Sequence, residues 1–317
     1  MTGFAGFTAA PLPVLAQQSL REVGFLHPAT IESSPTRLAG FAEGLRKRGF
    51  IEGQNVSVVA RWAGYDSPRI PIYAAELTKR NVAVIFAVGR EVVQSSRAAT
   101  STIPIVALDL ESDPVQSGFV VSLSRPGGNM TGLFFDFPEF TGKWLELLGE
   151  IIPGLKRVGA LWDPKTGSVQ VEALKSAAAQ RDVVLEVLQI EGPDLIDDRF
   201  RAAVAAKVQA VLAVSSPVFG TATQEMATAA LRHRMPCITP YPEFGRAGGL
   251  IAYGVEVSDL FRQGGELVGK VLGGMKPADL PVERPSTFEM VLNAKTAKAL
   301  GLTIPPSILA RADEVIE

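Results

Sequence analysis

Two alternating patterns of apolar and polar residues run along the first half of the chain. Short apolar or alternating runs predict strands at 22–26, 56–61, 82–88 and 103–108, with 119–123 as a candidate further strand. Apolar positions at helical spacing predict helices at 36–48, 67–80 and 89–99. This alternation of strands and helices indicates a mostly parallel sheet with helices on both faces.

The segment 125–132 (RPGGNMTG) interrupts this rhythm. Its proline and glycines indicate a break, and two interpretations stay open: a hinge or crossover, or an ordinary surface loop. The alternation then restarts and predicts a second α/β unit of similar size. Its predicted helices lie at 141–151, 169–180, 195–206 and 221–234, and its strands at 157–162, 183–190, 210–214 and 236–239.

The last part of the chain has too few elements for a third domain. Strands are predicted at 250–253 and 288–292, and helices at 258–272 and 294–300. These elements must complete the two existing sheets, so we expect an α/β fold of two doubly wound, Rossmann-like lobes joined by a multi-crossover hinge. The first lobe is predicted to comprise 20–131 and 254–284, and the second 132–253 and 285–317.

Composition narrows the chemistry open to such a chain. Its 317 residues suit two domains, and a hydrophobic content of 47% supports packed cores. The 31 Lys and Arg against 33 Asp and Glu lack the basic excess typical of nucleic-acid binders. One cysteine, Cys237, and two histidines, His27 and His233, exclude an internal disulfide, a cysteine zinc site and a histidine-rich metal centre. We expect no metal and no cofactor.

The N-terminal stretch 4–16 (FAGFTAAPLPVLA) is apolar and ends like a secretory signal that is cleaved after Ala16. Nothing basic precedes Arg21, so a disordered tail is the alternative interpretation. We predict that residues 1–16 are a signal segment. Cys237 lies far from this end, so we expect a periplasmic protein without a lipid anchor.

A series of short motifs between residue 23 and the C-terminus matches one known family. The motifs are VGFL at 23–26, FAEGL at 41–45, GFIEGQN at 49–55, RW at 61–62, IPIV at 103–106, DPV at 113–115, SRPGGNMTG at 124–132, KWLELL at 143–148, GGL at 248–250, YG at 253–254, KPADLPVE at 276–283, KTAKALGL at 295–302 and RADEVI at 311–316. By their order and number, they resemble the ABC-transporter substrate-binding proteins of the group that includes tryptophan/tyrosine-uptake receptors.

The resemblance implies a type I periplasmic-binding-protein fold with three crossovers and a ligand in the cleft between the lobes. It also implies a small-molecule ligand and an ABC permease as partners. Two segments depart from the family pattern, 89–90 (GR) and 134–137 (FFDF). Both are expected to face the cleft, which leaves open a ligand other than an aromatic amino acid.

In a doubly wound sheet, ligands bind beyond the carboxyl ends of the strands, and this rule selects the candidate residues. Ser33 and Ser34 precede a helix, where they hold a carboxylate or serve as a plain N-cap. Gly89 and Arg90 begin another helix, where Arg90 pairs with an anionic ligand or is a solvated surface residue.

Acidic residues follow the fourth predicted strand. Asp109, Glu111 and Asp113 alternate along the chain but supply too few oxygens for a cation site. Asp113 is expected to cap the turn before Pro114, with contact to a ligand ammonium as the alternative; Glu111 is a further candidate. Asp136, between two phenylalanines, is a second candidate for an ammonium group.

The second lobe offers Ser216, Phe219 and Tyr241 at its strand ends, and Tyr253 lies at a return crossing. The sequence around Ser216 lacks a nucleophile elbow, and no phosphate-binding loop is visible, so we expect no catalytic residue. The candidate lining suits a ligand with a carboxylate and a modest apolar or aromatic body, either with or without an ammonium group.

We therefore expect a non-enzymatic, monomeric receptor that captures an amino acid or an aromatic or aliphatic acid and delivers it to an ABC permease. The alternative is a cytosolic α/β enzyme that uses cleft carboxylates or a nucleotide. That enzyme would need a phosphate loop or a paired acid and base. The sensing half of a repressor would need a helix-turn-helix, which the first 20 residues do not provide.

Overall fold

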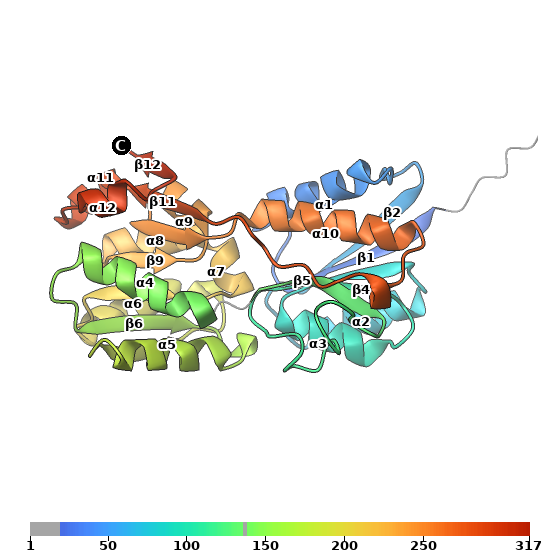
Figure 1. The fold of residues 1–317 in the computed structure, drawn as a ribbon, viewed down its shortest axis with the longest axis horizontal. Coiled ribbons are helices and arrows are strands. Elements are labelled where there is room, and N and C mark those ends of the chain that lie inside the picture. The colour runs from blue at the N-terminus through green and yellow to red at the C-terminus, as the bar shows by residue number, and fades with distance from the viewer. Residues whose placement is uncertain (1–19, 136–137) are drawn as a thin grey trace, which may run out of the picture.

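The computed structural model describes residues 20–135 and 138–317, and each of its two α/β lobes is built around its own sheet (Figure 1). The first sheet has five parallel strands in the order β2-β1-β3-β4-β5. Its strands are β1 (Arg21–His27), β2 (Val56–Trp62), β3 (Val84–Val88), β4 (Ile105–Asp109) and β5 (Met130–Phe134). Its helices are α1 (Pro35–Lys47), α2 (Arg69–Lys79), α3 (Arg90–Ala99) and α10 (Val257–Leu272).

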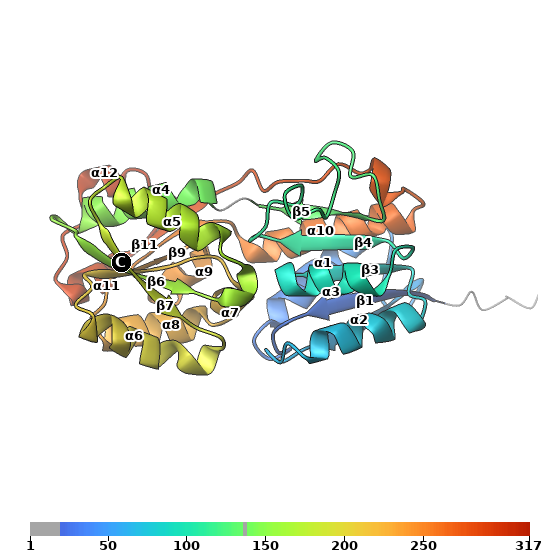
Figure 2. The same cartoon turned by 90° about the horizontal axis from the view of Figure 1, so that it is seen from below.

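Helices cover both faces of this first sheet, which explains why its strands are apolar almost throughout. Phe25 and Phe86 face α1 and α10, where their rings pack against Phe41 and Phe261 at centroid distances of 5.2 and 5.8 Å. The neighbouring residue Leu26 belongs to the separate core on the side of α2 and α3 (Figure 2).

Helix α10 follows strands of the second lobe in the sequence, but it belongs to the first lobe because it packs closely on α1. A Cβ atom added at Gly265 would lie 2.1 Å from the carbonyl oxygen of Phe41, so this contact requires glycine. The backbones of two helices far apart in the sequence therefore touch directly.

The second sheet has seven strands in the order β12-β11-β10-β9-β8-β6-β7, and only the β10–β11 pair is antiparallel. Its strands are β6 (Arg157–Trp162), β7 (Val184–Gln189), β8 (Ala210–Ala213), β9 (Cys237–Thr239), β10 (Ile251–Gly254), β11 (Glu289–Asn293) and β12 (Glu314–Ile316). Its α-helices are α4 (Pro138–Ile151), α5 (Val169–Ala179), α6 (Ile196–Ala205), α7 (Pro217–Thr221), α8 (Thr223–Arg232), α9 (Pro242–Arg246), α11 (Ala294–Leu300) and α12 (Pro306–Leu309). The predicted fold class is confirmed.

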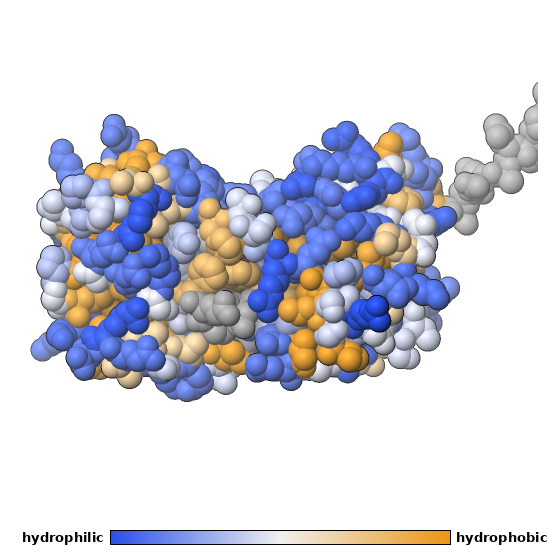
Figure 3. All heavy atoms as spheres, viewed as in Figure 1, coloured by the Kyte–Doolittle hydropathy of each residue, from blue (hydrophilic) through white to orange (hydrophobic). Residues whose placement is uncertain are grey.

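The chain passes between the lobes after β5, after β10 and again before β11. On the face shown in Figure 3, the surface is notched where the two lobes meet. The predicted boundary between 131 and 132 falls inside β5, and the one between 253 and 254 falls at the last residue of β10. Before the last crossing, Glu283 donates its N–H to the Gly132 carbonyl at 2.9 Å and so extends the edge of the first sheet.

The region around 119–132 differs from its prediction. Residues 119–123 form no strand; Phe119 and Val120 are instead buried in the core beside Phe134. The segment predicted as a hinge or loop runs directly into β5, which pairs with β4 from Met130 to Phe134. Glycine and proline concealed this strand in the sequence, because its pairing depends on β4 and not on local propensity.

Within 20–135 and 138–317, no helix combines the length and apolar character needed to cross a bilayer. The predicted signal segment at 1–16 lies outside the described residues.

Candidate functional site

The carboxyl ends of the two sheets face each other across a cavity with an empty volume of about 340 Å³. We call it the inner cavity. Its polar lining comprises Arg37 and Glu111 from the first lobe and Ser216 and Tyr241 from the second. Its apolar lining and backbone are Val88, Gly89, Leu108, Leu110, Val257 and Phe261 from the first lobe, and Pro217 and Gly220 from the second. Both lobes thus contribute to one space.

Arg37 brings a positive charge to the inner cavity. It lies in the first turn of α1, only 7% exposed, and its guanidinium carbon lies 5.7 Å from the centre of the Phe261 ring. Within the described part of the chain it donates to a neutral acceptor, the Gly220 carbonyl at 2.5 Å, and its Nη1 lies 3.4 Å from His27 Nε2. Burial lowers the pKa of Arg37, but a guanidinium stays charged in proteins. This cation is available to an anionic ligand.

His27 is fully buried behind Arg37 at the end of β1. Burial, and secondly the charge of Arg37, hold the pKa of its imidazole well below the usual value. Its Nδ1 accepts the Ala29 N–H at 3.1 Å. His27 is therefore a neutral support for Arg37 and does not line the inner cavity.

Glu111 brings a carboxyl group to the same cavity. The Ser215 hydroxyl of the second lobe donates to its Oε1 at 2.8 Å, whereas its Oε2 has no hydrogen-bond partner among the described residues. Burial, and secondly the nearby Asp109, raise the pKa of Glu111 well above its usual value. Glu111 thus combines a contact between the lobes with an unused oxygen.

The second-lobe wall presents neutral hydroxyl groups. The Tyr241 hydroxyl accepts the Ser216 N–H and donates to the Ser216 carbonyl, both at 2.9 Å, and it lies 3.0 Å from Ser215 Oγ. Burial raises the pKa of Tyr241, so the phenol remains protonated. Ser216 also caps α7, since its Oγ accepts the Val218 N–H at 3.0 Å. These bonds hold the wall in one geometry.

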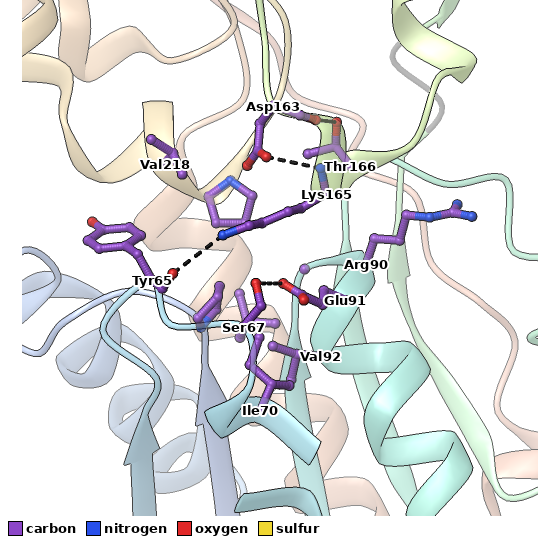
Figure 4. A pocket seen from close by; sticks show the side chains of 14 residues that line it. Tyr65, Ser67, Ile70, Arg90, Glu91, Val92, Asp163, Lys165, Thr166 and Val218 are labelled. Atoms are coloured by element: carbon purple, nitrogen blue, oxygen red, sulfur yellow. Dashed lines mark hydrogen bonds between the residues drawn. The ribbon is translucent and has the colours of Figure 1, made fainter. Parts of the chain in front are cut away.

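A second pocket between the lobes, with an empty volume of about 400 Å³, adjoins the inner cavity at Val88, Gly89 and Pro217 (Figure 4). We call it the outer pocket. Lys165 of the second lobe donates to the Tyr65 carbonyl of the first at 3.3 Å, and the Tyr65 hydroxyl lies 2.7 Å from Thr221 Oγ1. A Cβ added at Gly89, which has a φ of 80° and lines both spaces, would lie 2.9 Å from the Pro217 ring. The lobes are therefore closed on each other.

The predicted residues at the two helix starts have different surroundings. The Ser33 hydroxyl donates to the Thr30 carbonyl at 2.9 Å, and Ser34 is the N-cap residue of α1 but makes no side-chain capping bond. Neither lines the inner cavity or the outer pocket. Arg90 lines the outer pocket, but its guanidinium points away from Lys165 and donates to Ser112 Oγ at 2.8 Å (Figure 4).

Three further candidates lie away from both spaces. Asp113 caps its own loop by accepting the Val115 and Gln116 N–H groups at 2.8 and 2.9 Å. Phe219 is fully buried in the core. The Tyr253 carbonyl accepts the Trp144 indole N–H at 2.8 Å beside a crossing segment. Asp136 lies outside the described residues.

Arg37 was missed among the candidates, although the sequence contains a signal for it. It shares a helix face with Phe41, Gly44 and Leu45, the other buried residues of α1. An arginine in the apolar stripe of an amphipathic helix is unusual, because a buried charge needs a partner. Pro217 and Gly220 gave no such signal, since they come close to Gly89 and Arg37 only through lobe closure.

The described residues contain no group of three or more His, Cys, Asp or Glu side chains placed to hold a metal ion. What they do contain is a pair of α/β lobes, closed over a small cavity with charged and apolar walls. This arrangement defines a two-lobed binding protein of the type I periplasmic class.

The chain belongs to the family of ABC transporter substrate-binding proteins, whose model matches residues 23–316. It is 25% identical over 265 residues to a tyrosine-binding protein of Clostridioides difficile (strain R20291), covering 83% of this chain and 76% of that protein. The predicted resemblance is thereby confirmed.

Two solved structures share the fold along nearly the whole chain. One is a conserved domain protein from Vibrio cholerae, with a TM-score of 0.84, 25% identity, and coverage of 93% of this chain and 99% of that one. The other is an ABC domain in complex with L-Trp from Streptococcus pneumonia, with a TM-score of 0.83, 25% identity, and coverage of 94% and 100%.

Proposed function

We propose that this protein is an extracytoplasmic receptor that captures a small carboxylate-bearing solute between its lobes and delivers it to an ABC permease. The observation that carries this proposal is Arg37, a buried cation that lines the inner cavity and bonds only to neutral groups in the described chain. A carboxylate matches the planar donor pattern of a guanidinium.

The remaining walls suit the body of an amino acid or of a small aromatic or aliphatic acid. Leu108, Leu110 and Phe261 offer apolar surface, and Tyr241 adds an aromatic ring. The relatives named for tyrosine binding and for a complex with L-Trp support an amino acid in particular.

Closure of the lobes belongs to the same proposal. Hydrogen bonds without an ionic partner on the second lobe join the lobes, such as Tyr65 to Thr221 and Arg37 to Gly220. A solute that touches both walls adds contacts that exist only in the closed state, and so shifts the population toward it. We propose that the protein works as a monomer and catalyses no reaction.

Binding is tested with L-tryptophan, L-tyrosine, L-leucine and 3-phenylpropionate as acidic probes, and with D-xylose as a neutral control. At least one acid should raise the midpoint of thermal unfolding in proportion to the logarithm of its concentration, because it binds only the folded state. The same acid should compact the protein in solution scattering. Stabilisation by the sugar alone would overturn the carboxylate assignment.

Export is tested separately. N-terminal sequencing of protein recovered from the periplasm of the native host should begin near Gln17, after the predicted signal segment. Cytoplasmic protein that retains Met1 would contradict the proposed location without affecting the ligand assignment.

A further inference from the structure

Two carboxyl groups meet at the end of β4, at the edge of the inner cavity. Asp109 is fully buried and Glu111 is 3% exposed. The Glu111 N–H donates to Asp109 Oδ1 at 2.9 Å, so the Asp109 side chain folds back along the loop toward Glu111. Each carboxyl retains one buried oxygen without a hydrogen-bond partner among the described residues, Oδ2 of Asp109 and Oε2 of Glu111.

Only Glu111 of this pair lines the inner cavity. The Ser215 hydroxyl reaches it from the second lobe and fixes Oε1 at 2.8 Å. Arg37 lines the same cavity from α1, so a cation and a carboxyl group border one space with apolar walls. A buried, unpaired carboxyl oxygen is costly unless a donor reaches it.

The other groups around the pair leave its negative charge largely uncompensated. Asp163, at the end of β6, further disfavours ionisation of Glu111, and Arg90, at the start of α3, favours ionisation of Asp109. Tyr241, before α9, is a neutral phenol. Burial raises the pKa of both carboxyl groups; the charge of Asp109 raises the pKa of Glu111 further, whereas hydrogen bonding to Glu111 lowers the pKa of Asp109. The pair therefore holds one proton when the cavity contains no cation.

We propose that Glu111, backed by Asp109, is the binding site for the amine of the solute, and that the solute ammonium replaces the proton held by this carboxyl pair. This inference rests on the proposed function and narrows its substrate class to amino acids. The zwitterion places its carboxylate at Arg37 and its ammonium at Glu111. The displaced proton leaves to solvent and both carboxyls become anionic, so the carboxyl pair with the bound ammonium carries the same charge as the protonated pair did.

A plain carboxylic acid lacks the cation and cannot displace this proton. It would bind with the carboxyl pair still protonated and would bring no charged partner to Glu111. Discrimination between an amino acid and its deaminated analogue is therefore the expected property of Glu111.

The test uses calorimetry on the whole protein with matched probes: L-tryptophan and 3-indolepropionate, L-phenylalanine and 3-phenylpropionate, and L-leucine and 4-methylpentanoate. Titrations in two buffers of different ionisation enthalpy count the protons released. The amine-bearing member of a binding pair should bind at least ~30-fold more tightly and release close to one proton, as expected for loss of a charge-assisted contact.

Glu111→Gln keeps the shape but removes the charge, so it should reduce the preference to about 3-fold and abolish proton release. Glu225→Gln is the matched control, because Glu225 lies exposed on α8; it should behave as wild type. If the substitution at Glu111 impairs folding, the proton count of the wild-type protein alone decides.

Equal binding of a matched pair, or amino-acid binding without proton release, would overturn this inference and leave the carboxylate receptor standing. Failure of every acid to bind would overturn the receptor proposal and this inference with it.

Discussion

The two walls of the inner cavity carry different chemistry. The first-lobe wall presents a guanidinium, that of Arg37, and a carboxyl group, that of Glu111, whereas the second-lobe wall presents hydroxyl groups and backbone from Ser216, Tyr241 and Gly220. The charged groups are positioned by their own lobe, Arg37 by α1 and Glu111 by the loop after β4. The neutral groups reach them only when the lobes close, as the Arg37–Gly220 and Ser215–Glu111 bonds show.

This difference indicates a division of labour. Arg37 and Glu111 can meet a solute before closure, because both are carried on secondary structure or a loop of the first lobe alone. Neutral groups on the opposite wall then add hydrogen bonds without introducing a competing charge. The first lobe would thus determine which solute binds, and the second would determine how long the closed state persists.

The largest expected effect comes from removing the cation of the first-lobe wall. Arg37→Met leaves a bound carboxylate without a buried partner, so the affinity for an acidic probe should fall ~100-fold or more, or about 3 kcal/mol. Calorimetry measures this change. Arg46→Met on the exposed side of the same helix is the matched control. Unchanged affinity in Arg37→Met would place the carboxylate elsewhere.

A substitution in the second-lobe wall should lower the stability of the protein and leave its ligand selectivity unchanged. Tyr241→Phe removes the acceptor of the buried Ser216 N–H, so the free energy of unfolding should fall by about 1–3 kcal/mol. Urea denaturation measures the loss, and Tyr73→Phe on the partly exposed face of α2 is the control. If Tyr241→Phe instead changed the preference between amino acids and deaminated acids without loss of stability, the second-lobe wall would also determine selectivity, contrary to this prediction.

The free energy of unfolding should depend on pH through Glu243, an acidic residue on α9 that does not line the inner cavity. Burial, and secondly Glu256, raise the pKa of Glu243 on α9 from an ordinary 4.5 to about 7. Between these values the folded protein binds more protons than the unfolded chain, so stability is greatest below the lower value and is lost as pH rises toward about 7.

Glu243→Gln should remove on the order of 1 kcal/mol of this pH-dependent change, after allowance for the partial exposure of the side chain. Denaturation of the ligand-free protein across this range measures it, with Glu225→Gln as the control. An unaltered slope would show that the cavity acids account for the pH dependence.

The smallest expected effect concerns the contact between the lobes at Tyr65, beside the outer pocket. Tyr65→Phe removes the hydroxyl that lies 2.7 Å from Thr221 Oγ1 in the opposite lobe. The closed state should lose about 0.5–1.5 kcal/mol, so ligand affinity should fall up to ~10-fold while the unfolding of the ligand-free protein changes little. Calorimetry and urea denaturation measure the two quantities. An equal loss in both would mean that Tyr65 supports folding and not closure.

The local pattern of apolar and polar residues predicted the two-lobed fold well, but it predicted only some of the residues that line the inner cavity. Continuous apolar strands between amphipathic helices require burial on both faces, and the structure shows this at Phe25 and Leu26. β5 was missed because glycine and proline mask its pattern, while its pairing partner β4 lies more than twenty residues earlier. Arg90 was selected as a helix-start cation, yet it lines the outer pocket and not the inner cavity, and it donates to Ser112.

The sequence by itself determined the order of strands and helices, the return of the C-terminal part to complete both sheets, and the family. These follow from the periodicity of apolar residues, from glycines and prolines that end helices and strands, and from short sequence motifs, all of which are local along the chain. Only the tertiary structure decided that Arg37 and Glu111 border one cavity and that Ser215 reaches Glu111 from the other lobe. Those positions depend on lobe closure and on loops that meet from distant parts of the chain, and no local pattern encodes the distance between them.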